Sequence, residues 1–307
     1  MLIRVVVLNF RRSDLTLSCV SDILNQSYRP LDIIVVDNSV QGSEEELLRK
    51  TLPKGVTLVC NPNNLGYSAG NNVGLRPMPF LDRPDMSLIV NSDVRFLEAE
   101  TIANLASALN CDSGAVAISP VVVNPVNPEL RNAVQVRRCP TYGDMLVANS
   151  CWLRRLGRLR HIWHKHTYQD LVPLSPERVY SCDSINGCCF LIRQDFLESI
   201  DYLDEGTFLY YEELILALQI KARHRHCLLH AGECVRHFQG SSSGQGFKRV
   251  VWPLFREEIK SQLYLCERYL RCSGGQRNLL RAVRLVDFCL RRAQMVLLDS
   301  ARLFRQQ

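Results

Sequence analysis

The stretch "VTLVCNPNNLGYSAGNNVGL", residues 56–75, joins a short apolar run to a segment with five asparagines and three glycines. The run over 56–60 is typical of a buried strand, and the polar residues 61–64 predict a loop at its carboxyl end. Residues 68–75 predict a helix, although each glycine inside a helix costs roughly 1 kcal/mol.

The three glycines of this stretch, Gly66, Gly70 and Gly74, are four residues apart. We therefore expect them along one side of the turn and helix, where they let the backbone approach a ligand and a neighbouring strand. The flanking asparagines exclude a membrane helix with a G-x-x-x-G contact face.

Outward from this stretch, the first 120 residues alternate β-branched runs with helical patterns, which indicates an α/β fold with a parallel sheet and right-handed crossovers. Helices are predicted over 14–26, 43–50 and 96–109. The strands are predicted over 3–9, 31–38, 56–60 and 86–93.

Each predicted strand ends in polar residues, and ligands of such sheets bind beyond the carboxyl ends of the strands. These ends are Asn9-Phe10, Asp37-Asn38, residues 61–64 and 91–93. A dinucleotide site is not indicated, because no G-x-G-x-x-G follows the first strand, and a Walker lysine loop is also absent.

The two aspartates at these ends suit a nucleotide, with the base or ribose on Asp37 and a divalent cation on Asp93 that reaches the phosphates. A structural interpretation stays open for both residues. Asp37 would then be a turn or helix N-cap residue, and Asp93 would cap the helix predicted over 96–109.

Composition indicates a globular protein of 307 residues, 47% of them apolar. The thirteen cysteines are scattered, without a C-x-x-C pair or a secretory leader, so we expect reduced thiols in a cytoplasmic protein. No run of apolar residues is long enough for a membrane span.

The tail from 277 to 307 has a basic face, with its arginines on one side of a predicted helix and its apolar residues on the other. Such a helix fits an anionic membrane surface, the catalytic domain, or a second subunit in a homodimer. Nucleic acid is not expected, because no stacking platform accompanies the charges. The arginines are 277, 281, 284, 291, 292, 302 and 305, and the apolar residues are Leu279, Val283, Val286, Leu290, Ala293 and Leu297.

The ordered motifs resemble those of family 2 glycosyltransferases with the GT-A fold, in particular rhamnosyltransferase-like enzymes of bacterial O-antigen and other surface polysaccharides. The resemblance implies a catalytic domain over 1–245 and a helical extension over 246–307. The domain would have a nucleotide-sugar half over 1–120 and an acceptor half over 121–245. The motifs are "VVVLNF", "IIVVDNSVQGS", "NPNNLGYSAGNNVGL", "IVNSDV", "INGCCFLIRQDFLESIDYLDEGTFLYYEEL" and "HFQGSSSG".

The resemblance implies a donor site in the first half and a metal site for Mg²⁺ or Mn²⁺ at Asp93 and His237. Asn91 stands where many relatives have a carboxylate, so only one acidic ligand comes from this motif. A structural histidine is the alternative for His237. The implied donor-binding residues are Asn9, Phe10, Asp37, Asn38, Asn64, Gly66, Asn71, Asn91 and Asp93.

In the second half, the acidic pair after the aromatic residues matches the position of the family's general base. The base falls on Glu213, with Glu212 as the alternative, and Ile215 replaces a further aspartate. Two acids at a helix N-terminus are also structurally favourable. The acceptor side is assigned to Asn186, Gly187, Asp204 and Glu205, although the last two also suit a turn.

The predicted activity is an inverting transfer of L-rhamnose from dTDP-L-rhamnose to a lipid-linked saccharide acceptor. A UDP-hexose or UDP-N-acetylhexosamine is the alternative donor. The departures at Asn91, Glu213 and Ile215 leave open a catalytically dead subunit that binds sugar nucleotides. A lipid-linked acceptor would place the protein at the inner face of the plasma membrane.

Overall fold

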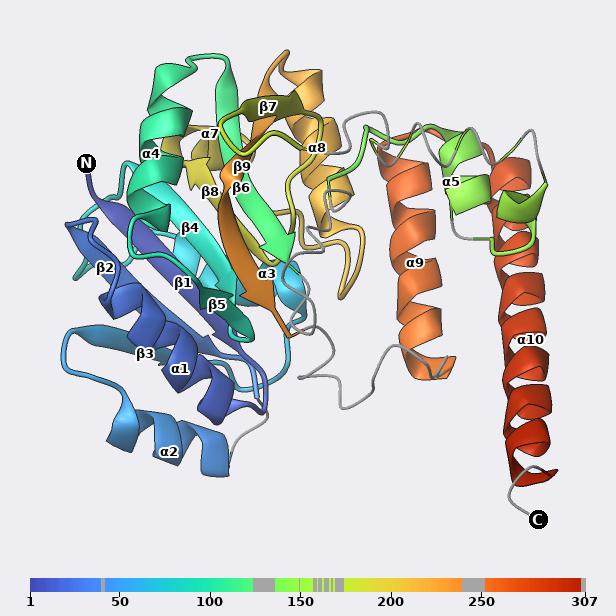
Figure 1. Cartoon of the computed structure of the whole chain (residues 1–307), viewed down its shortest axis with the longest axis horizontal. Helices are drawn as coiled ribbons and strands as arrows, with labels where there is room; N and C mark the ends of the chain where they lie inside the picture. Colours follow the sequence, from blue (N-terminus) through green and yellow to red (C-terminus); the bar gives the residue numbers. More distant parts are fainter. Residues whose placement is uncertain are drawn as a thin grey trace.

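The computed structural model describes residues 1–39, 42–123, 136–148, 150–156, 174–238 and 252–304, together with 159, 162, 166 and 168. A nine-stranded sheet with strand order β3-β2-β1-β4-β8-β6-β9-β5, and β7 paired to β9, forms its centre (Figure 1). Two long helices, α9 (Trp252–Arg268) and α10 (Gly274–Phe304), stand to one side.

The first half is the predicted series of parallel strands and helices. Because the strands pair in register, Asn9 lies opposite Asp37, and Leu8 opposite Asn91, at one edge of the sheet. This confirms that the polar strand ends meet. The elements are β1 (Ile3–Asn9), α1 (Ser13–Leu24), β2 (Leu31–Asp37), α2 (Ser43–Thr51), β3 (Val56–Cys60), α3 (Tyr67–Leu75) and β4 (Met86–Asn91).

The glycines of α3 allow this helix to lie directly on the sheet. A Cβ atom on Gly74 would be 2.8 Å from Cγ1 of Val6, and one on Gly70 would be 2.9 Å from Cδ1 of Leu8. The predicted close approach to neighbouring strands is therefore confirmed for both residues. Gly66 has φ +83°, and its Cβ atom would be 2.3 Å from the carbonyl oxygen of Phe208, so it approaches the second half of the chain instead.

The helix predicted over 96–109 begins later than expected. Residues Val94–Phe96 form strand β5, and α4 (Thr101–Cys111) follows with Glu100 at its N-cap. Asp93 therefore does not cap this helix, and that structural interpretation is wrong. The apolar residues of β5 pair with β9 (His226–His237), a strand far along the chain, which a local pattern does not reveal.

The second half makes the sheet mixed. Strand β8 is antiparallel to both β4 and β6, whereas β6 is parallel to β9. Because β8 pairs directly with β4, the two predicted halves share one continuous sheet. The remaining elements are β6 (Ala115–Val123), α5 (Tyr142–Ala148), η2 (Leu153–Arg155), β7 (Val179–Cys182), β8 (Cys189–Arg193), α7 (Gln194–Ser199) and α8 (Glu212–Ala222).

Alternate side chains of the central strands fill two apolar cores, one on each face of the sheet. Val5 and Val7 pack with α1 and α4 on one face, while Val6 packs with α3 and α8 on the other. A third cluster joins α8 to α9 and the start of α10, and it includes Leu214, Leu265 and Leu280. The C-terminal helices are thus part of the packed structure.

Helix α10 packs against α9 with an unexpected face. Arg284 and Asp287 are buried, whereas Leu279, Val286 and Leu290 are exposed. The alternative in which the apolar stripe packs on the catalytic domain is therefore wrong for these residues. The physical reason is that ion pairs with α9 and within α10 occupy the inward face.

The predicted boundary at 245/246, with its Gly-Ser run, lies outside the described residues. All thirteen cysteines lie within the described part, and none forms a disulfide there. Burial raises the pKa of Cys189 to about 12, which keeps its thiol protonated. Among the described residues, no helix has the length and hydrophobicity needed to span a membrane.

Candidate active site

The carboxyl ends of β1 and β2 form a buried polar pair. Nδ2 of Asn9 donates a 2.9 Å hydrogen bond to Oδ1 of Asp37, and the backbone N–H of Ser39 donates to the same oxygen at 3.0 Å. Asp37 therefore holds the turn after β2, as the structural interpretation required, and also lies at the edge where a nucleotide would bind. The two interpretations are compatible.

An asparagine network shapes the loop after β3. Nδ2 of Asn38 donates to Oδ1 of Asn64 and to the carbonyl oxygen of Gly66, both at 2.9 Å. Oδ1 of Asn38 accepts hydrogen bonds from Nδ2 of Asn61 and from the backbone of Leu65. These contacts hold the loop against β2, so the observed partners of Asn38, Asn64 and Gly66 are internal, and their donor-binding role stays a prediction.

Asn71 is buried in the first turn of α3, where its Nδ2 donates to the carbonyl oxygen of Tyr67 at 3.0 Å. Its Oδ1 atom is buried and has no hydrogen-bond partner among the described residues. Contact with a donor therefore stays a prediction for this residue too.

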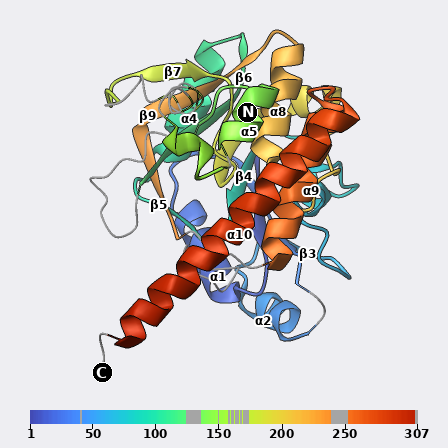
Figure 2. The ribbon, with the colours of Figure 1, turned by 90° about the vertical axis from the view of Figure 1, so that its right-hand side faces the viewer.

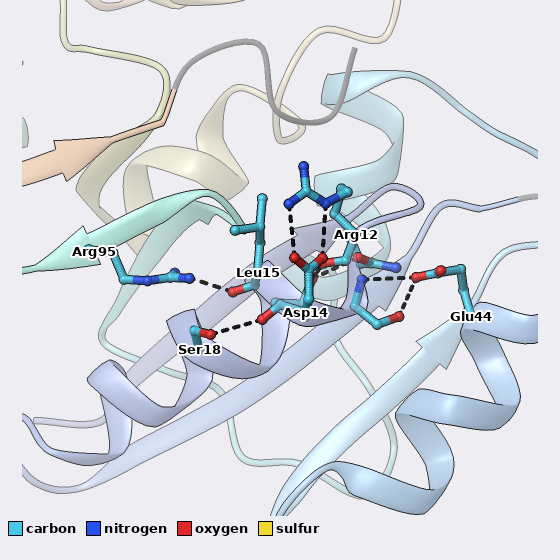
Figure 3. A network of polar contacts seen from close by, with 9 residues as sticks. Arg12, Asp14, Leu15, Ser18, Glu44 and Arg95 are labelled. Atoms are coloured by element: carbon cyan, nitrogen blue, oxygen red, sulfur yellow. Dashed lines mark hydrogen bonds and ion pairs between the residues drawn. The ribbon is translucent and has the colours of Figure 1, made fainter. Parts of the chain in front are cut away.

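Arginines follow β1 at the same edge. The guanidinium of Arg11 lies 5.2 Å from the ring centroid of Phe10, and Arg12 pairs with Asp14 at 2.9 Å. Figure 3 shows this pair at the start of α1, beside Glu44, which accepts from Ser13. The pKa of Arg12 is raised by its bond to Asp14 and, more weakly, by the charge of Asp93. A cation thus lies near the predicted metal site.

Asp93 and His237 are brought together although they are far apart in the sequence. Nε2 of His237 lies 3.1 Å from Oδ1 of Asp93, and both side chains are largely buried. The pairing of β5 with β9 places them, because Val94 lies opposite His237, and the Phe238 N–H donates to the Asp93 carbonyl at 3.0 Å. The predicted neighbourhood of these two residues is thus present.

The side chains of Asp93 and His237 suit a divalent cation as ligands. A carboxylate oxygen beside an imidazole nitrogen suits Mn²⁺, and two protein ligands leave coordination positions for phosphate oxygens and water. Within the described ranges, no group of three or more His, Cys, Asp or Glu side chains could hold an ion. A cation at Asp93 and His237 would therefore depend on a bound ligand for most of its coordination.

The segment before β8 is hydrogen-bonded to the carboxyl end of β4. Oδ1 of Asn186 accepts from the Cys188 N–H at 3.0 Å, and the Asn91 N–H donates to the Cys188 carbonyl at 2.8 Å. Two predicted site residues, Asn91 and Asn186, are therefore joined through Cys188. This connection fixes the acceptor-side segment to the carboxyl end of β4.

Gly187 stands at the centre of a small cluster around Glu213. A Cβ atom on Gly187 would lie 3.8 Å from Oε2 of Glu213 and 3.8 Å from the hydroxyl of Tyr67. The Tyr67 hydroxyl donates to the Gly187 carbonyl. Because Tyr67 is the first residue of α3, the start of that helix and Glu213, the predicted base, both lie next to Gly187.

The two glutamates of α8 have different environments. Burial and the neighbouring Glu213 raise the pKa of Glu212 from 4.5 to about 8. Burial also raises the pKa of Glu213, but the helix backbone and, more weakly, the charge of Arg137 oppose that rise. Arg137 is therefore a counter-charge that favours the ionised form of Glu213.

Asp204 and Glu205 have structural partners. The Asp204 carboxylate accepts from the hydroxyls of Tyr264, at 3.0 Å, and Tyr269, and so attaches α9 and the residue after it to the segment between α7 and α8. Glu205 accepts from Asn72 at 2.8 Å and pairs with Arg76 at 2.9 Å. Their acceptor-side role stays a prediction that these contacts do not support.

The burial of Ile215 explains why this position departs from the family pattern. Ile215 is buried in the cluster between α8 and α9, so an apolar residue suits this position.

The sequence did not indicate Tyr67, Arg137 or Arg12 as residues of the candidate site. The aromatic residue between Gly66 and Gly70 was a visible signal for Tyr67, whereas the position of Arg137 results from tertiary packing alone.

The sheet topology and the polar strand ends define the GT-A class of nucleotide-sugar transferase folds. Residues 2–252 match the model of glycosyltransferase-like family 2. The chain belongs to this family.

One curated relative is the low-salt glycan biosynthesis hexosyltransferase Agl10 of Haloferax volcanii. It is 28% identical over 184 residues, which cover 60% of this chain and 51% of the relative. The chain thus spans about half the length of this relative.

Solved structures support the fold. The mannosyltransferase PcManGT from Pyrobaculum calidifontis, in complex with GDP-Man and Mn²⁺, is 14% identical with a TM-score of 0.58, over 99% of this chain and 80% of that one. GalNAc-T7 with UDP, GalNAc and Mn²⁺ is 13% identical with a TM-score of 0.58, over 86% and 47%. At these identities the likeness shows the fold alone.

Proposed function

We propose that the chain is an inverting glycosyltransferase of glycan biosynthesis, which moves a hexose from a nucleotide diphosphate donor to a saccharide acceptor. The observation that carries the proposal is the Asp93–His237 pair, in which Oδ1 of Asp93 lies 3.1 Å from Nε2 of His237. This pair lies at the same edge of the sheet as the strand ends that carry Asn9 and Asp37. Family membership and the hexosyltransferase relative support the same reaction.

The finer proposal names dTDP-L-rhamnose as donor and a lipid-linked saccharide of surface polysaccharide assembly as acceptor. It is supported by the rhamnosyltransferase-like motifs of residues 61–75 and 185–214. A UDP-hexose or UDP-N-acetylhexosamine is the alternative donor. With a lipid-linked acceptor, the protein would act at the inner face of the plasma membrane.

In the proposed mechanism, Asn9 and Asp37 bind the base or ribose, and the diphosphate lies near Asp93, His237 and Arg12. Asp93 and His237 would hold Mg²⁺ or Mn²⁺, which neutralises charge on a departing diphosphate when bound. The sugar lies toward Gly187 and Glu213.

Glu213 accepts the proton of the acceptor hydroxyl as its oxygen attacks the anomeric carbon from the face opposite the diphosphate. The new carbon–oxygen glycosidic bond forms while the bond to the diphosphate breaks, and the electron pair leaves with the diphosphate. The products are an inverted glycoside, the nucleoside diphosphate and protonated Glu213.

The first test is a thermal-shift panel of dTDP- and UDP-sugars with and without Mn²⁺. A donor that binds only the folded state raises the melting midpoint by mass action, and we expect the largest rise with the true donor. Asp93→Asn should reduce the Mn²⁺-dependent part of that rise. If every sugar nucleotide leaves the midpoint unchanged, the donor site is wrong.

The second test compares wild type with Glu213→Gln in transfer and donor hydrolysis. Loss of a general base lowers turnover by roughly 10²–10⁴-fold, and donor binding in the thermal-shift panel should persist. Glu212→Gln is the matched control and should retain more activity. Donor binding without turnover by wild type would instead favour the catalytically dead subunit.

A further inference from the structure

Helix α10 carries an apolar stripe, defined here as Leu279, Val283, Val286, Leu290 and Ala293. Leu279, Val286 and Leu290 are 53%, 49% and 47% exposed. Ala293 is also exposed, and Val283 is partly so. Figure 2 shows α10 crossing the outside of the molecule in front of α9. The stripe therefore has no partner among the described residues of the chain.

The rotation of α10 about its own axis is fixed by its inward face. Buried Arg284 pairs with Glu258 of α9 at 2.7 Å and lies 5.0 Å from the ring centroid of Phe255. Asp287, which is fully buried, accepts from the Cys151 N–H at 2.7 Å and pairs with Arg291 at 2.6 Å. Rolling the helix to bury the stripe would break these pairs and leave uncompensated charges, which is strongly unfavourable.

The spacing of the stripe is that of a coiled coil. Its residues are separated by four, three, four and three positions, and Leu297 continues the series in the sequence. This repeat averages 3.5 residues, which keeps a seam facing a second helix, whereas a stripe with the 3.6-residue period of a straight helix drifts. In heptad terms, Val283 and Leu290 occupy a positions, and Leu279, Val286 and Ala293 occupy d positions.

Charge placement favours a protein partner over a lipid surface. The exposed residues beside the seam are neutral: Ala282 and Cys289 at g positions, and Gln294 at e. Like charges would therefore not meet across a pair of helices. A helix that lies on an anionic membrane needs basic residues at the borders of its apolar face. Here the arginines whose side chains are described lie away from the seam, at b, c and f positions: 277, 281, 284, 291 and 292.

We propose that this stripe is a self-association surface, at which α10 of one copy pairs with α10 of a second copy in a two-stranded coiled coil. The same patch would serve both copies about a twofold axis, so the assembly closes as a dimer. This inference rests on α10 alone and does not depend on the proposed transfer reaction.

Sedimentation of the full chain over a wide concentration range tests the proposal. Wild type should reach twice the 35.1 kDa chain mass. The double variant Val286→Glu and Leu290→Glu should remain a monomer with an unchanged melting midpoint, because both side chains are exposed. Arg281→Glu with Arg292→Glu, exposed outside the seam, is the matched control and should still dimerise. A monomeric wild type, or a dimeric seam variant, would overturn the proposal.

Cross-linking gives a second readout that needs no charge substitution in the seam. Cys289 and Cys111 are the two exposed cysteines, and only Cys289 lies beside the seam. A short bismaleimide should give a dimer with wild type and Cys111→Ser, but none with Cys289→Ser. Binding of a monomeric chain to anionic phospholipid vesicles, abolished by the seam variant, would assign the stripe to a membrane and refute self-association.

Discussion

At the residue scale, the proposed chemistry depends on how one carboxylate of an adjacent pair keeps its charge. Arg137 opposes the rise in the pKa of Glu213 that burial causes. Burial and the charge of Glu213 raise the pKa of Glu212 to about 8. Arg137 favours the ionised form of Glu213, although it comes from the segment before α5, far from α8 in the sequence.

Arg137→Gln should therefore shift the acidic limb of the pH profile of kcat/KM to higher pH. Without the positive charge, the pKa of Glu213 rises further, so less of the base is ionised at a given pH below that limb. Activity should fall most at low pH and recover as pH rises. Arg138→Gln is the matched control, because the neighbouring Arg138 guanidinium lies 4.0 Å from the Tyr168 ring centroid. An unshifted limb in Arg137→Gln would contradict the assignment of Glu213 as base.

At the element scale, Asp204 attaches α9 and the residue after it to the segment between α7 and α8, through the hydroxyls of Tyr264 and Tyr269. Asp204→Ala should lower the free energy of unfolding by about 1.5–3 kcal/mol, since two partly buried hydroxyl donors lose a charged acceptor. Transfer activity per folded molecule should change little. Glu205→Gln is the control, because the Glu205–Arg76 pair is largely exposed and such pairs contribute about 1 kcal/mol or less. Urea denaturation measures the change in stability, and steady-state kinetics measure the change in transfer activity. Loss of activity with unchanged stability would instead restore the acceptor-side role.

Some of the strands and helices could be predicted from the sequence, and others could not. Strands β1 to β4 and their polar ends were predictable, because β-branched runs and short connections are local signals. Strand β5 was not, because "VRF" is stabilised by β9, which begins more than a hundred residues later. The inward face of α10 was also missed, since burial of Arg284 and Asp287 depends on partners in α9 and near Cys151. Asp93 and His237 could be paired only through the family resemblance.

At the scale of the whole molecule, the raised pKa of Glu212 links folding to pH. Between its ordinary value of 4.5 and about 8, the folded chain holds a proton at Glu212 that the unfolded chain releases. The stability contribution of this group therefore decreases as pH rises through that window. Glu212→Gln should remove this part of the slope, and its melting midpoint should rise relative to wild type between pH 5 and 8, as tested by thermal denaturation across that range. Glu46→Gln, exposed on α2, should keep the wild-type slope, and a parallel Glu212→Gln curve would contradict the assignment.

The Asp93–His237 contact also bears on the synthesis of the chain. The two residues are neighbours in space but 144 positions apart, from 93 to 237. The Asn9–Asp37 hydrogen bond joins β1 and β2, which are synthesised early, whereas the Asp93–His237 pair exists only after β9 has left the ribosome. A nascent or prematurely terminated chain would therefore have the first pair but lack the second. Under the proposed function, competence for transfer would be coupled to completion of the sheet, and unfinished chains would leave the cellular pool of activated sugar intact.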